Sequence, residues 1–419
     1  YSVYNYINSG VDNGSALDDA YDSLEHRGAL KWNEFTSSQD YNIWPSNENQ
    51  LLSALKTRLV SWNCLFLTTS DITNIKSGQL NGIKQALNDG KVLVVGVKCA
   101  DDFSNISTTN TSNGYVITRL SDINNYHAMT IVGYDDSITV DVNKDGKIEA
   151  AERGAFKVAN SWGNKWKNSG YIWVLYDALN SESQISTDWE KNQGLTGTRS
   201  VVFSDRYQQN ARNSFYEIFV ENKDVDVVAK VKGKSTHLYN LQVGINARGY
   251  SISYMPAVSK RNYATAQNFV MLYDYSDFYN DFSYLLGNKI WLTHFRTIQP
   301  TLHTKITFCN PTVSNFEYSL VDNKNNQIAK CSTSVTSFTT SQNIEAKYSK
   351  DFQINTNMKR GSVDFDSNIT LTDANLVQKY ALGILEPSNL QSYLADYNQD
   401  GKVDLTDAKA VLNVALGVN

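Results

Sequence analysis

Apolar residues near the start of the chain recur at the spacing of an amphipathic helix. In the segment 15–28 they fall at Leu17, Ala20, Tyr21 and Leu24, so they share one side of a helix. A serine at the start of this segment can cap the first turn, and a glycine at its end favours termination. The segment is therefore predicted to be a helix with one buried face.

The chain up to about residue 190 combines further helical segments with strand patterns. Helical patterns cover 47–58 and 82–88. Apolar, β-branched and aromatic runs typical of strands cover 92–97, 128–132, 155–158 and 171–176. Helices followed by strands predict an α+β domain with a twisted antiparallel sheet.

The middle of the chain contains only short strand patterns separated by turn residues. They cover 215–220, 225–231, 238–245, 289–293 and 302–308 and predict an all-β sandwich module of unknown ligand. Aromatic residues of this region would suit either a sugar-stacking face or ordinary packing: Tyr273, Tyr275, Phe278 and Tyr279. The polar segment 346–359 is predicted to be a linker.

Charge and composition narrow the function classes. Lys and Arg total 38 against 43 Asp and Glu, a net charge of -5, so nothing favours a nucleic acid or an anionic membrane as partner. No apolar run approaches the roughly 18–20 residues that span a bilayer. The start at Tyr1 has no initiator Met and no signal-peptide pattern, so we expect a processed N-terminus. Abundant Tyr (25) with few Cys (4) suits a secreted bacterial protein.

Two motifs carry the clearest chemical signal. HA-x-x-x-V-G-Y begins at His127, and NSWG-x-x-W-x-x-x-GY begins at Asn160. Together they resemble the His and Asn motifs of papain-like cysteine peptidases. In that family the His accepts the thiol proton and the Asn carbonyl fixes the imidazole tautomer. The resemblance implies that His127 and Asn160 are catalytic, whereas a lone histidine before a strand would be read as an ordinary polar residue.

The same resemblance implies a set of substrate-binding residues. Gly14 and Ser15 would bind the substrate main chain as an added β-strand. Val95 and Tyr126 would line the main specificity pocket, and core packing is an equally good interpretation of Val95. Trp162 would shield the His–Asn hydrogen bond, with Trp166 as a neighbouring aromatic.

The family's nucleophile run, Gln followed by Cys-Gly-Ser-Cys-Trp, does not occur in the sequence. The four cysteines read as small buried hydrophobes or possible disulfide partners: Cys64, Cys99, Cys309 and Cys331. Because the family's nucleophile precedes the glycine segment, we expect the catalytic Cys upstream of Tyr1. Two hypotheses follow, a secreted cysteine peptidase and, alternatively, a catalytically inactive module that binds a peptide or inhibitor.

An insertion between the two motifs follows the EF-hand calcium rule. Its predicted ligands are Asp141, Asn143, Asp145, the Lys147 carbonyl and Glu152. Glycine at loop position 6 and isoleucine at position 8 also fit the rule. The alternative is a charged surface hairpin without an ion.

The tail contains two further loops of this type, 362–373 and 396–407, each followed by one helix. The predicted ligands are Asp364, Asp366 and Asp373 in the first copy and Asp396, Asn398, Asp400 and Asp407 in the second. The first copy departs from the rule at position 1, which is Ser362, and at position 6, which is Ser367.

Duplicated loops that end in Asp, each followed by a helix closed by Ala-Leu-Gly, resemble a dockerin. The resemblance implies a small α module that binds calcium and a cohesin module of a scaffoldin. The expected cohesin contacts are Leu371, Thr372, Leu405 and Thr406. Because the two Leu-Thr pairs are identical, the resemblance also implies two binding orientations related by an internal pseudo-twofold axis.

These observations predict a multidomain protein. The expected parts are a papain-like peptidase domain without its nucleophile segment at 1–200, the β-sandwich at 201–345, the linker at 346–359 and the dockerin at 360–419. We expect a secreted, extracellular, cellulosome-associated cysteine peptidase that uses Ca²⁺, acts on a peptide or protein substrate and serves polysaccharide degradation. Neither a nucleic acid nor a membrane span is expected.

Overall fold

The computed structural model describes most of the chain. The described residues are 3, 7, 15, 17–31, 33–35, 45, 47–64, 77–98, 108–119, 126–179, 185, 202–203, 215–247, 250–254, 256, 266–278, 281–297, 310–341 and 350–418. They belong to two compact units. One unit comprises Ala16–Tyr21 and Leu59–Glu221, and the other comprises Tyr1–Ser15, Asp22–Arg58 and Asn222–Asn419.

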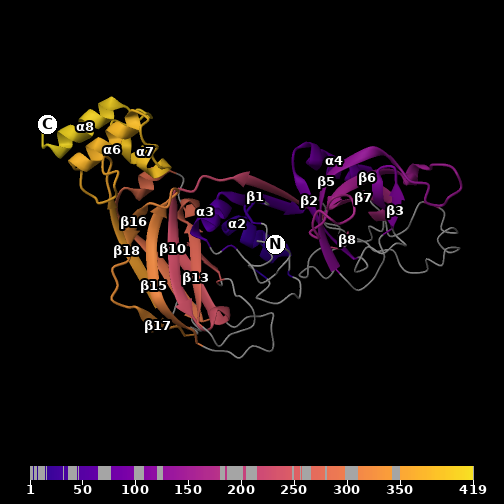
Figure 1. The fold of residues 1–419 in the computed structure, drawn as a ribbon, viewed down its shortest axis with the longest axis horizontal. Helices are drawn as coiled ribbons and strands as arrows, with labels where there is room; N and C mark the ends of the chain where they lie inside the picture. The colour runs from indigo at the N-terminus through magenta and orange to yellow at the C-terminus, as the bar shows by residue number, and fades with distance from the viewer. Residues whose placement is uncertain are drawn as a thin grey trace. The chain divides into compact units, whose positions relative to one another are not determined.

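The first of these units is built on one sheet (Figure 1). Within the described residues it has nine strands in the order β1-β9-β2-β5-β6-β7-β4-β3, with β8 also pairing with β2. The strands are β1 Thr57–Cys64, β2 Val92–Lys98, β3 Thr108–Thr111, β4 Gly114–Ile117, β5 Tyr126–Thr139, β6 Arg153–Ala159, β7 Tyr171–Leu175, β8 Val202–Phe203 and β9 Phe215–Asn222. The registered pairs are antiparallel except β4 with β7, which is parallel, so the expected antiparallel sheet has this one exception.

Helix α4 (Ser77–Asn88) is longer than predicted and contacts β2 and β5 of this sheet. Helix α2 (Leu17–His26) falls within the predicted segment 15–28. Short 3-10 turns, η1 (Ala150–Glu152) and η2 (Tyr176–Leu179), follow β5 and β7. The core of the unit contains the inward side chains of the central strands, such as Leu93, Ile131 and Phe156.

Two antiparallel sheets form most of the other unit. One has the order β13-β10-β15-β16 with β17 on β15, and the other has the order β12-β11-β14-β18. Their strands are β10 Val227–Ser235, β11 Leu241–Ala247, β12 Tyr250–Tyr254, β13 Gln267–Asp274, β14 Gly287–Thr297, β15 Thr312–Asp322, β16 Gln327–Lys330, β17 Ser337–Thr339 and β18 Lys350–Met358. Short 3-10 turns join them: η3 Leu238–Asn240, η4 Tyr275–Phe278 and η5 Phe282–Leu285.

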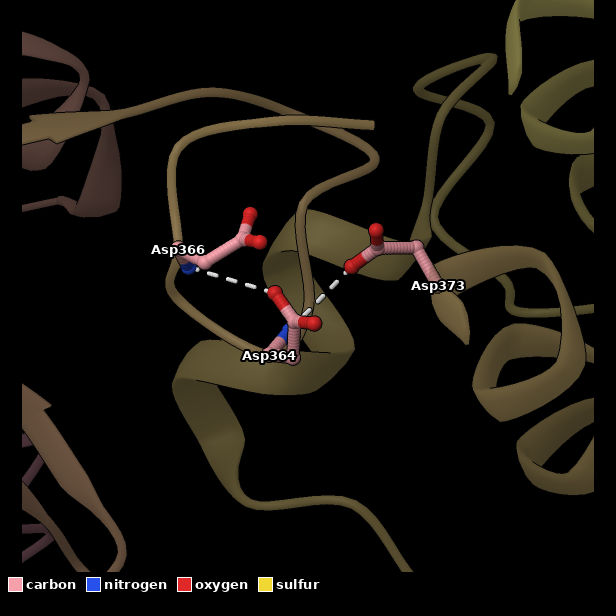
Figure 2. Close-up of side chains that lie close together, drawn as sticks. All are labelled: Asp364, Asp366 and Asp373. Atoms are coloured by element: carbon pink, nitrogen blue, oxygen red, sulfur yellow. Dashed lines mark hydrogen bonds between the residues drawn. The ribbon is translucent and has the colours of Figure 1, made fainter. Parts of the chain in front are cut away.

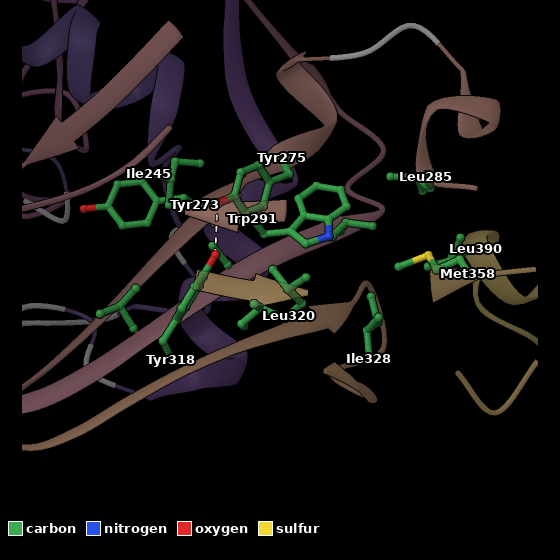
Figure 3. Packing of buried hydrophobic residues seen from close by; sticks show 14 of the residues in the cluster. Ile245, Tyr273, Tyr275, Leu285, Trp291, Tyr318, Leu320, Ile328, Met358 and Leu390 are labelled. Atoms are coloured by element: carbon green, nitrogen blue, oxygen red, sulfur yellow. Dashed lines mark hydrogen bonds between the residues drawn. The ribbon is translucent and has the colours of Figure 1, made fainter. Parts of the chain in front are cut away.

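Buried faces of both sheets contribute to one hydrophobic cluster (Figure 3). Tyr275 and Tyr318 meet in it through their hydroxyls at 3.0 Å. Trp291 donates from Nε1 to Thr356 at 2.7 Å, so the indole N–H is satisfied in the core. Tyr273 is also buried, with 3 % of its surface exposed, and Tyr275 is fully buried, which supports the packing interpretation for these two aromatics. Tyr279 and the segment 302–308 lie outside the described residues.

The predicted linker is wrong for most of its length, because Lys350–Met358 is strand β18, paired with β14. Its polar residues alternate with Phe352, Ile354 and Met358, which point into the shared core. Alternation with period two is the signature of a half-buried strand, and the high polar content of its exposed face obscured it.

Three helices complete the C-terminal part of this unit (yellow in Figure 1). They are α6 (Leu371–Ala381), α7 (Asn389–Ala395) and α8 (Leu405–Ala415). One further helix, α3 (Glu48–Leu55), lies near the start of the chain, is capped by Asn47 and ends earlier than predicted. None of the helices in the described residues is long and apolar enough to span a membrane.

Candidate functional site

The pairing of β5 with β6 brings the two sequence motifs together. Thr130 lies opposite Ala159, so the start of β5 lies beside the residue that follows β6. His127 Nε2 consequently lies 2.8 Å from Asn160 Oδ1. The structure therefore places the two predicted catalytic residues in direct hydrogen-bond contact.

The hydrogen bonds of Asn160 define the state of the imidazole. Asn160 Oδ1 also accepts the backbone N–H of Ser161 at 2.7 Å, which identifies this atom as the amide oxygen. His127 must then donate from Nε2, which leaves Nδ1 unprotonated in the neutral ring. Burial lowers the pKa of His127, and the hydrogen bond to Asn160 partly offsets that effect. This tautomer can accept a proton at Nδ1.

Aromatic rings adjoin the His–Asn pair. The Trp162 ring centroid lies 5.1 Å from that of His127, and Trp166 packs edge-on against Trp162 at 5.5 Å. Both tryptophans pack against the core of the unit. Rings in these positions restrict the access of water to a hydrogen bond, which strengthens it electrostatically.

The predicted substrate-binding residues are only partly described. Ser15 is exposed, and Gly14 lies outside the described residues. Tyr126 begins β5, but its side chain is also outside them. Val95 is 2 % exposed, lies opposite Met129 and belongs to the hydrophobic core. Within the described residues, the structure thus brings together His127, Asn160 and Trp162.

Of the cysteines, only Cys331 has a described side chain, and it follows β16. Burial raises the pKa of the Cys331 thiol, with a smaller opposing effect from a backbone hydrogen bond to Gln353. A raised pKa disfavours the thiolate that a cysteine nucleophile requires. Cys331 is therefore not activated as a nucleophile.

The loop between β5 and β6 has a defined hydrogen-bond pattern. Asp141 accepts the N–H groups of Asp145 at 3.2 Å and Gly146 at 3.0 Å, and Asn143 accepts that of Asp145 at 3.0 Å. Asp145 in turn accepts the Lys147 N–H at 2.8 Å. These turns gather the first three predicted ligands around the inside of one loop.

Glu152 closes the same loop from its far end. Its side chain is fully buried and accepts the backbone N–H groups of Val142 at 2.6 Å, Asn143 at 3.4 Å and Glu149 at 3.1 Å. The carboxylate at loop position 12 therefore binds the backbone at positions 2, 3 and 9.

The second tail loop repeats this pattern. Asp396 accepts the N–H groups of Asp400 at 3.1 Å and Gly401 at 3.0 Å. Asp407, also fully buried, accepts those of Tyr397, Asn398 and Asp404 at 2.9, 3.1 and 3.0 Å. Positions 2, 3 and 9 are again the donors, so two loops in different units share one local structure.

In the first tail loop, Asp373 is fully buried and accepts the N–H groups of Val363 at 2.8 Å, Asp364 at 3.3 Å and Thr370 at 2.9 Å. Figure 2 shows Asp364, Asp366 and Asp373 converging, and one carboxylate oxygen from each lies within 4.8 Å of the others. Burial and the neighbouring carboxylates raise the pKa of Asp364. A cation between these oxygens would remove their mutual repulsion.

Ser362 occupies position 1 of that loop. It is 1 % exposed, and its Oγ has no hydrogen-bond partner within the part of the chain that the structure describes. A buried hydroxyl without a partner is costly unless a further ligand contacts it. A hard cation that takes oxygen ligands fits this environment.

The predicted partner-binding pairs lie at equivalent places. Leu371 and Leu405 begin α6 and α8 and are 57 % and 53 % exposed, and Thr372 and Thr406 are also exposed. The two helices pack against each other. Large apolar side chains with this exposure are typical of an interaction surface.

The sequence analysis did not assign to Thr370 and Asp404 the role of orienting the loop-closing carboxylates. Each is the N-cap of its helix and forms a capping box with Asp373 or Asp407. The spacing of a Thr or Asp three residues before a carboxylate was the available signal.

Comparison with protein families gives two matches. Residues 4–191 match the papain family cysteine protease, and residues 360–414 match the dockerin type I domain. The resemblance to a papain-like cysteine peptidase with a C-terminal dockerin is therefore confirmed for both parts of the chain. A comparison with curated proteins found no match.

Similar solved structures are cysteine proteases. Xylellain from Xylella fastidiosa has 16% identity and a TM-score of 0.30, over 52% of this chain and 68% of that one. Bromelain from Ananas comosus has 14% identity and a TM-score of 0.29, over 48% and 76%. Digestive procathepsin L 3 of Tenebrio molitor has 15% identity and a TM-score of 0.26, over 48% and 53%.

Proposed function

We propose that this chain is the greater part of a secreted papain-like cysteine peptidase that is anchored to a cellulosome scaffold through its dockerin. The observation that carries the proposal is the 2.8 Å contact between His127 and Asn160, within a region that matches the papain family. A dockerin match on the same chain supports the anchoring. The substrate class is the peptide bond of a protein.

In the proposed chemistry, a cysteine preceding Tyr1 supplies the thiol. His127 Nδ1 accepts the thiol proton, and the resulting thiolate attacks the scissile carbonyl carbon. The peptide C–N bond then breaks, and the imidazolium returns its proton to the leaving amine. Water subsequently hydrolyses the acyl-enzyme. Asn160 holds the ring in the tautomer that this sequence of transfers needs.

Hydrolysis of a fluorogenic peptide tests this proposal. The chain 1–419 should show no hydrolysis that an epoxide thiol inhibitor blocks, because the proposed nucleophile precedes Tyr1. A longer protein that includes the residues before Tyr1 should hydrolyse the peptide and lose that activity with His127→Ala. Inhibitor-sensitive turnover by the chain 1–419 would contradict the assignment of the nucleophile.

The second candidate is a catalytically inactive papain-like module that binds a peptide or inhibitor. It is favoured by the raised thiol pKa of Cys331, the cysteine that the structure describes. The longer protein distinguishes the two candidates, because a binding module would retain the peptide without cleaving it.

We further propose that Ca²⁺ binds to each of the three loops. Asp141, Asn143, Asp145 and Glu152, with the Lys147 carbonyl, would bind one ion. The tail ligands would be Asp364, Asp366 and Asp373 in one loop and Asp396, Asn398, Asp400 and Asp407 in the other. The buried Ser362 hydroxyl and the gathered carboxylates support a hard cation there.

The proposed partner is a cohesin module of a scaffoldin. Leu371–Thr372 and Leu405–Thr406 would contact it, since both pairs are exposed at the start of a helix. With this partner, the protein would be extracellular. Attached to a scaffold that serves polysaccharide degradation, the peptidase would meet its protein substrates among the wall polymers.

A further inference from the structure

The five-stranded sheet has an outer face with its own composition. Along β10, Val227, Ala229 and Val231 are fully buried in the core that the two sheets share. Because side chains alternate along a strand, Val228, Lys230 and Lys232 lie on the opposite face. This outer face is thus apolar at one end and basic along the rest.

The acidic and apolar side chains on one side of helix α3 are complementary to this face. Glu48, Leu52 and Leu55 lie at positions i, i+4 and i+7 and share one side of the helix. Leu52 and Leu55 form a hydrophobic cluster with apolar residues at the ends of the sheet strands: Val225, Val228 and Val321. The apolar end of the outer face therefore packs against the apolar turns of α3.

The basic part of the face binds the first turn of the same helix. Lys230 Nζ lies 3.0 Å from Glu48 Oε2, and Lys232 pairs with the other oxygen of the same carboxylate. Burial opposes the ionisation of Glu48, but the hydrogen bonds and charges of Lys232 and Lys230 outweigh it and lower the pKa. One carboxylate shared by two partly buried ammonium groups fixes the register of the helix on the strand.

A buried ion pair lies just beyond the helix. Arg58 pairs with Asp274 of β13, and the two residues are 1 % and 2 % exposed. Asp274 lies opposite Val228 in the sheet, so this pair adjoins the apolar contact with α3. Removing one partner would leave a buried charge uncompensated, which is strongly destabilising.

The residues that follow α2 contact the four-stranded sheet of the same unit. The Arg27 guanidinium lies over the Tyr254 ring at 4.5 Å, and Tyr254 stacks on Tyr273 at 6.1 Å. Gly28 has φ +70°, and a Cβ there would meet the Ala54 carbonyl oxygen at 1.8 Å. The turn after α2 therefore lies in close contact with the C-terminal end of α3, so the ends of the two helices pack together.

We infer that the outer face of the five-stranded sheet is an intramolecular docking surface whose partner is the chain's own segment 48–58. That segment lies inside the papain-family match, so the β-rich region is a structural part of the peptidase and not a separate module for an external ligand. Dividing the chain near residue 200 into two separate proteins would separate this segment from the sheet on which it packs. That this region serves a peptidase rests on the proposed function.

Hydrogen exchange followed by mass spectrometry on the whole chain tests the docking without any need for peptidase activity. Lys230→Glu with Lys232→Glu places two negative charges against Glu48. Amides of α3 should then exchange roughly fivefold to tenfold faster, as expected for a loss of about 1 kcal/mol or somewhat more. Adding Glu48→Lys to this double variant should restore the parental exchange rate.

Lys234→Glu is the matched control, since it lies on the same face of β10 but outside the two Glu48 ion pairs. It should leave the α3 amides unchanged. The inference is overturned if the double variant exchanges like the parent in α3, or if the control accelerates exchange in α3 equally. It is also overturned if the double variant loses protection throughout β10 and β15 and the triple variant does not recover it. A docking result combined with an inactive longer protein would uphold this inference and reject the peptidase.

Discussion

At the scale of single residues, Asn160 is the side chain on which the state of the candidate active site depends. Its Oδ1 accepts two hydrogen bonds, from Ser161 and from His127, and therefore cannot exchange places with the amide nitrogen without leaving a donor facing a donor. The position of one oxygen consequently decides which nitrogen of His127 can receive a proton.

Replacing Asn160 should shift the pKa of His127 in a direction set by the substituent. Asn160→Ala removes the hydrogen bond that raises the pKa, so burial should lower it further. Asn160→Asp keeps the size and adds a negative charge, so the pKa should rise. Histidine proton NMR across a pH titration measures both, with His127→Gln to assign the signal. Equal pKa values in the parent and both variants would mean that the two side chains do not interact.

The backbone conformation of Ser367 leads to a second prediction at this scale. In the three loops, positions 4 and 6 share positive φ: Lys144 and Gly146, Phe365 and Ser367, Gln399 and Gly401. Ser367 has φ 72° where the other loops have glycine, and a side chain in this region costs about 1 kcal/mol. Ser367→Gly should slow hydrogen exchange in α6 by up to about fivefold in calcium.

Gly401→Ser is the reciprocal change in the second tail loop and should accelerate exchange in α8. If neither substitution alters exchange, or if both act in the same direction, the strain assigned to Ser367 is absent.

The contact between His127 and Asn160 could be predicted because the two motifs resemble those of one family, which requires these residue types at these places. The calcium ligands follow from the spacing within the loops and stay predictions. Val95 could not be assigned, since one apolar residue on a strand serves a pocket or a core equally well, and the structure shows it in the core. The pairing of Arg58 with Asp274 had no local signal, because 216 residues separate them.

At the scale of elements, the loop between β5 and β6 connects directly into the strand that precedes Asn160. Its Glu152 is fully buried and accepts three backbone N–H groups, which hold the carboxylate in place. A bound ion would add its positive charge at the open end of the loop, where Asp141 and Asp145 lie.

Glu152→Gln removes the negative charge that should hold calcium in this loop. Calorimetric titration of the whole chain should then show one calcium ion fewer than the parent. Asp89→Asn is the control, because Asp89 is an exposed carboxylate of the same unit outside the loop and its removal should keep the parental stoichiometry. An unchanged stoichiometry in Glu152→Gln would show that this loop is a charged hairpin without an ion.

Element types were largely predictable, and element ends and partners were not. The helix α2 and the strand β2 lie where the spacing places them. Strand β18 was mistaken for a linker because its exposed face is entirely polar, and its pairing with β14 depends on a residue run more than 50 positions away. The helix α3 ended early because its last predicted turn instead enters β1.

At the scale of the whole molecule, the dockerin contacts the β-rich part of the same unit, and α7 makes two of these contacts. Phe282 stacks on Tyr393 at 5.0 Å, and Asn389 donates to Asp226 at 3.0 Å. Three residues separate Met358, the end of β18, from Ser362, where the first tail loop begins. Leu371 and Leu405 remain exposed on α6 and α8, so this anchoring does not cover the proposed cohesin contacts.

Two equivalent Leu-Thr pairs predict two binding orientations. Replacing Leu405 and Thr406 by Ala should weaken cohesin binding by only about twofold, because one of two equal orientations remains. Replacing both pairs should abolish it. Calorimetry with a type I cohesin in calcium measures these affinities, and a single-pair variant that loses all binding would refute the dual mode.

The most direct test of the account uses the longer protein, including the residues before Tyr1, captured on immobilised type I cohesin. Hydrolysis of a fluorogenic peptide is measured on the beads in calcium and again after a chelator wash. We predict thiol-dependent hydrolysis that stays on the beads in calcium, leaves them with the chelator and is absent from His127→Ala. Activity that never binds the beads, or that survives His127→Ala, would contradict the claim that this chain brings a papain-type His–Asn pair to a scaffold.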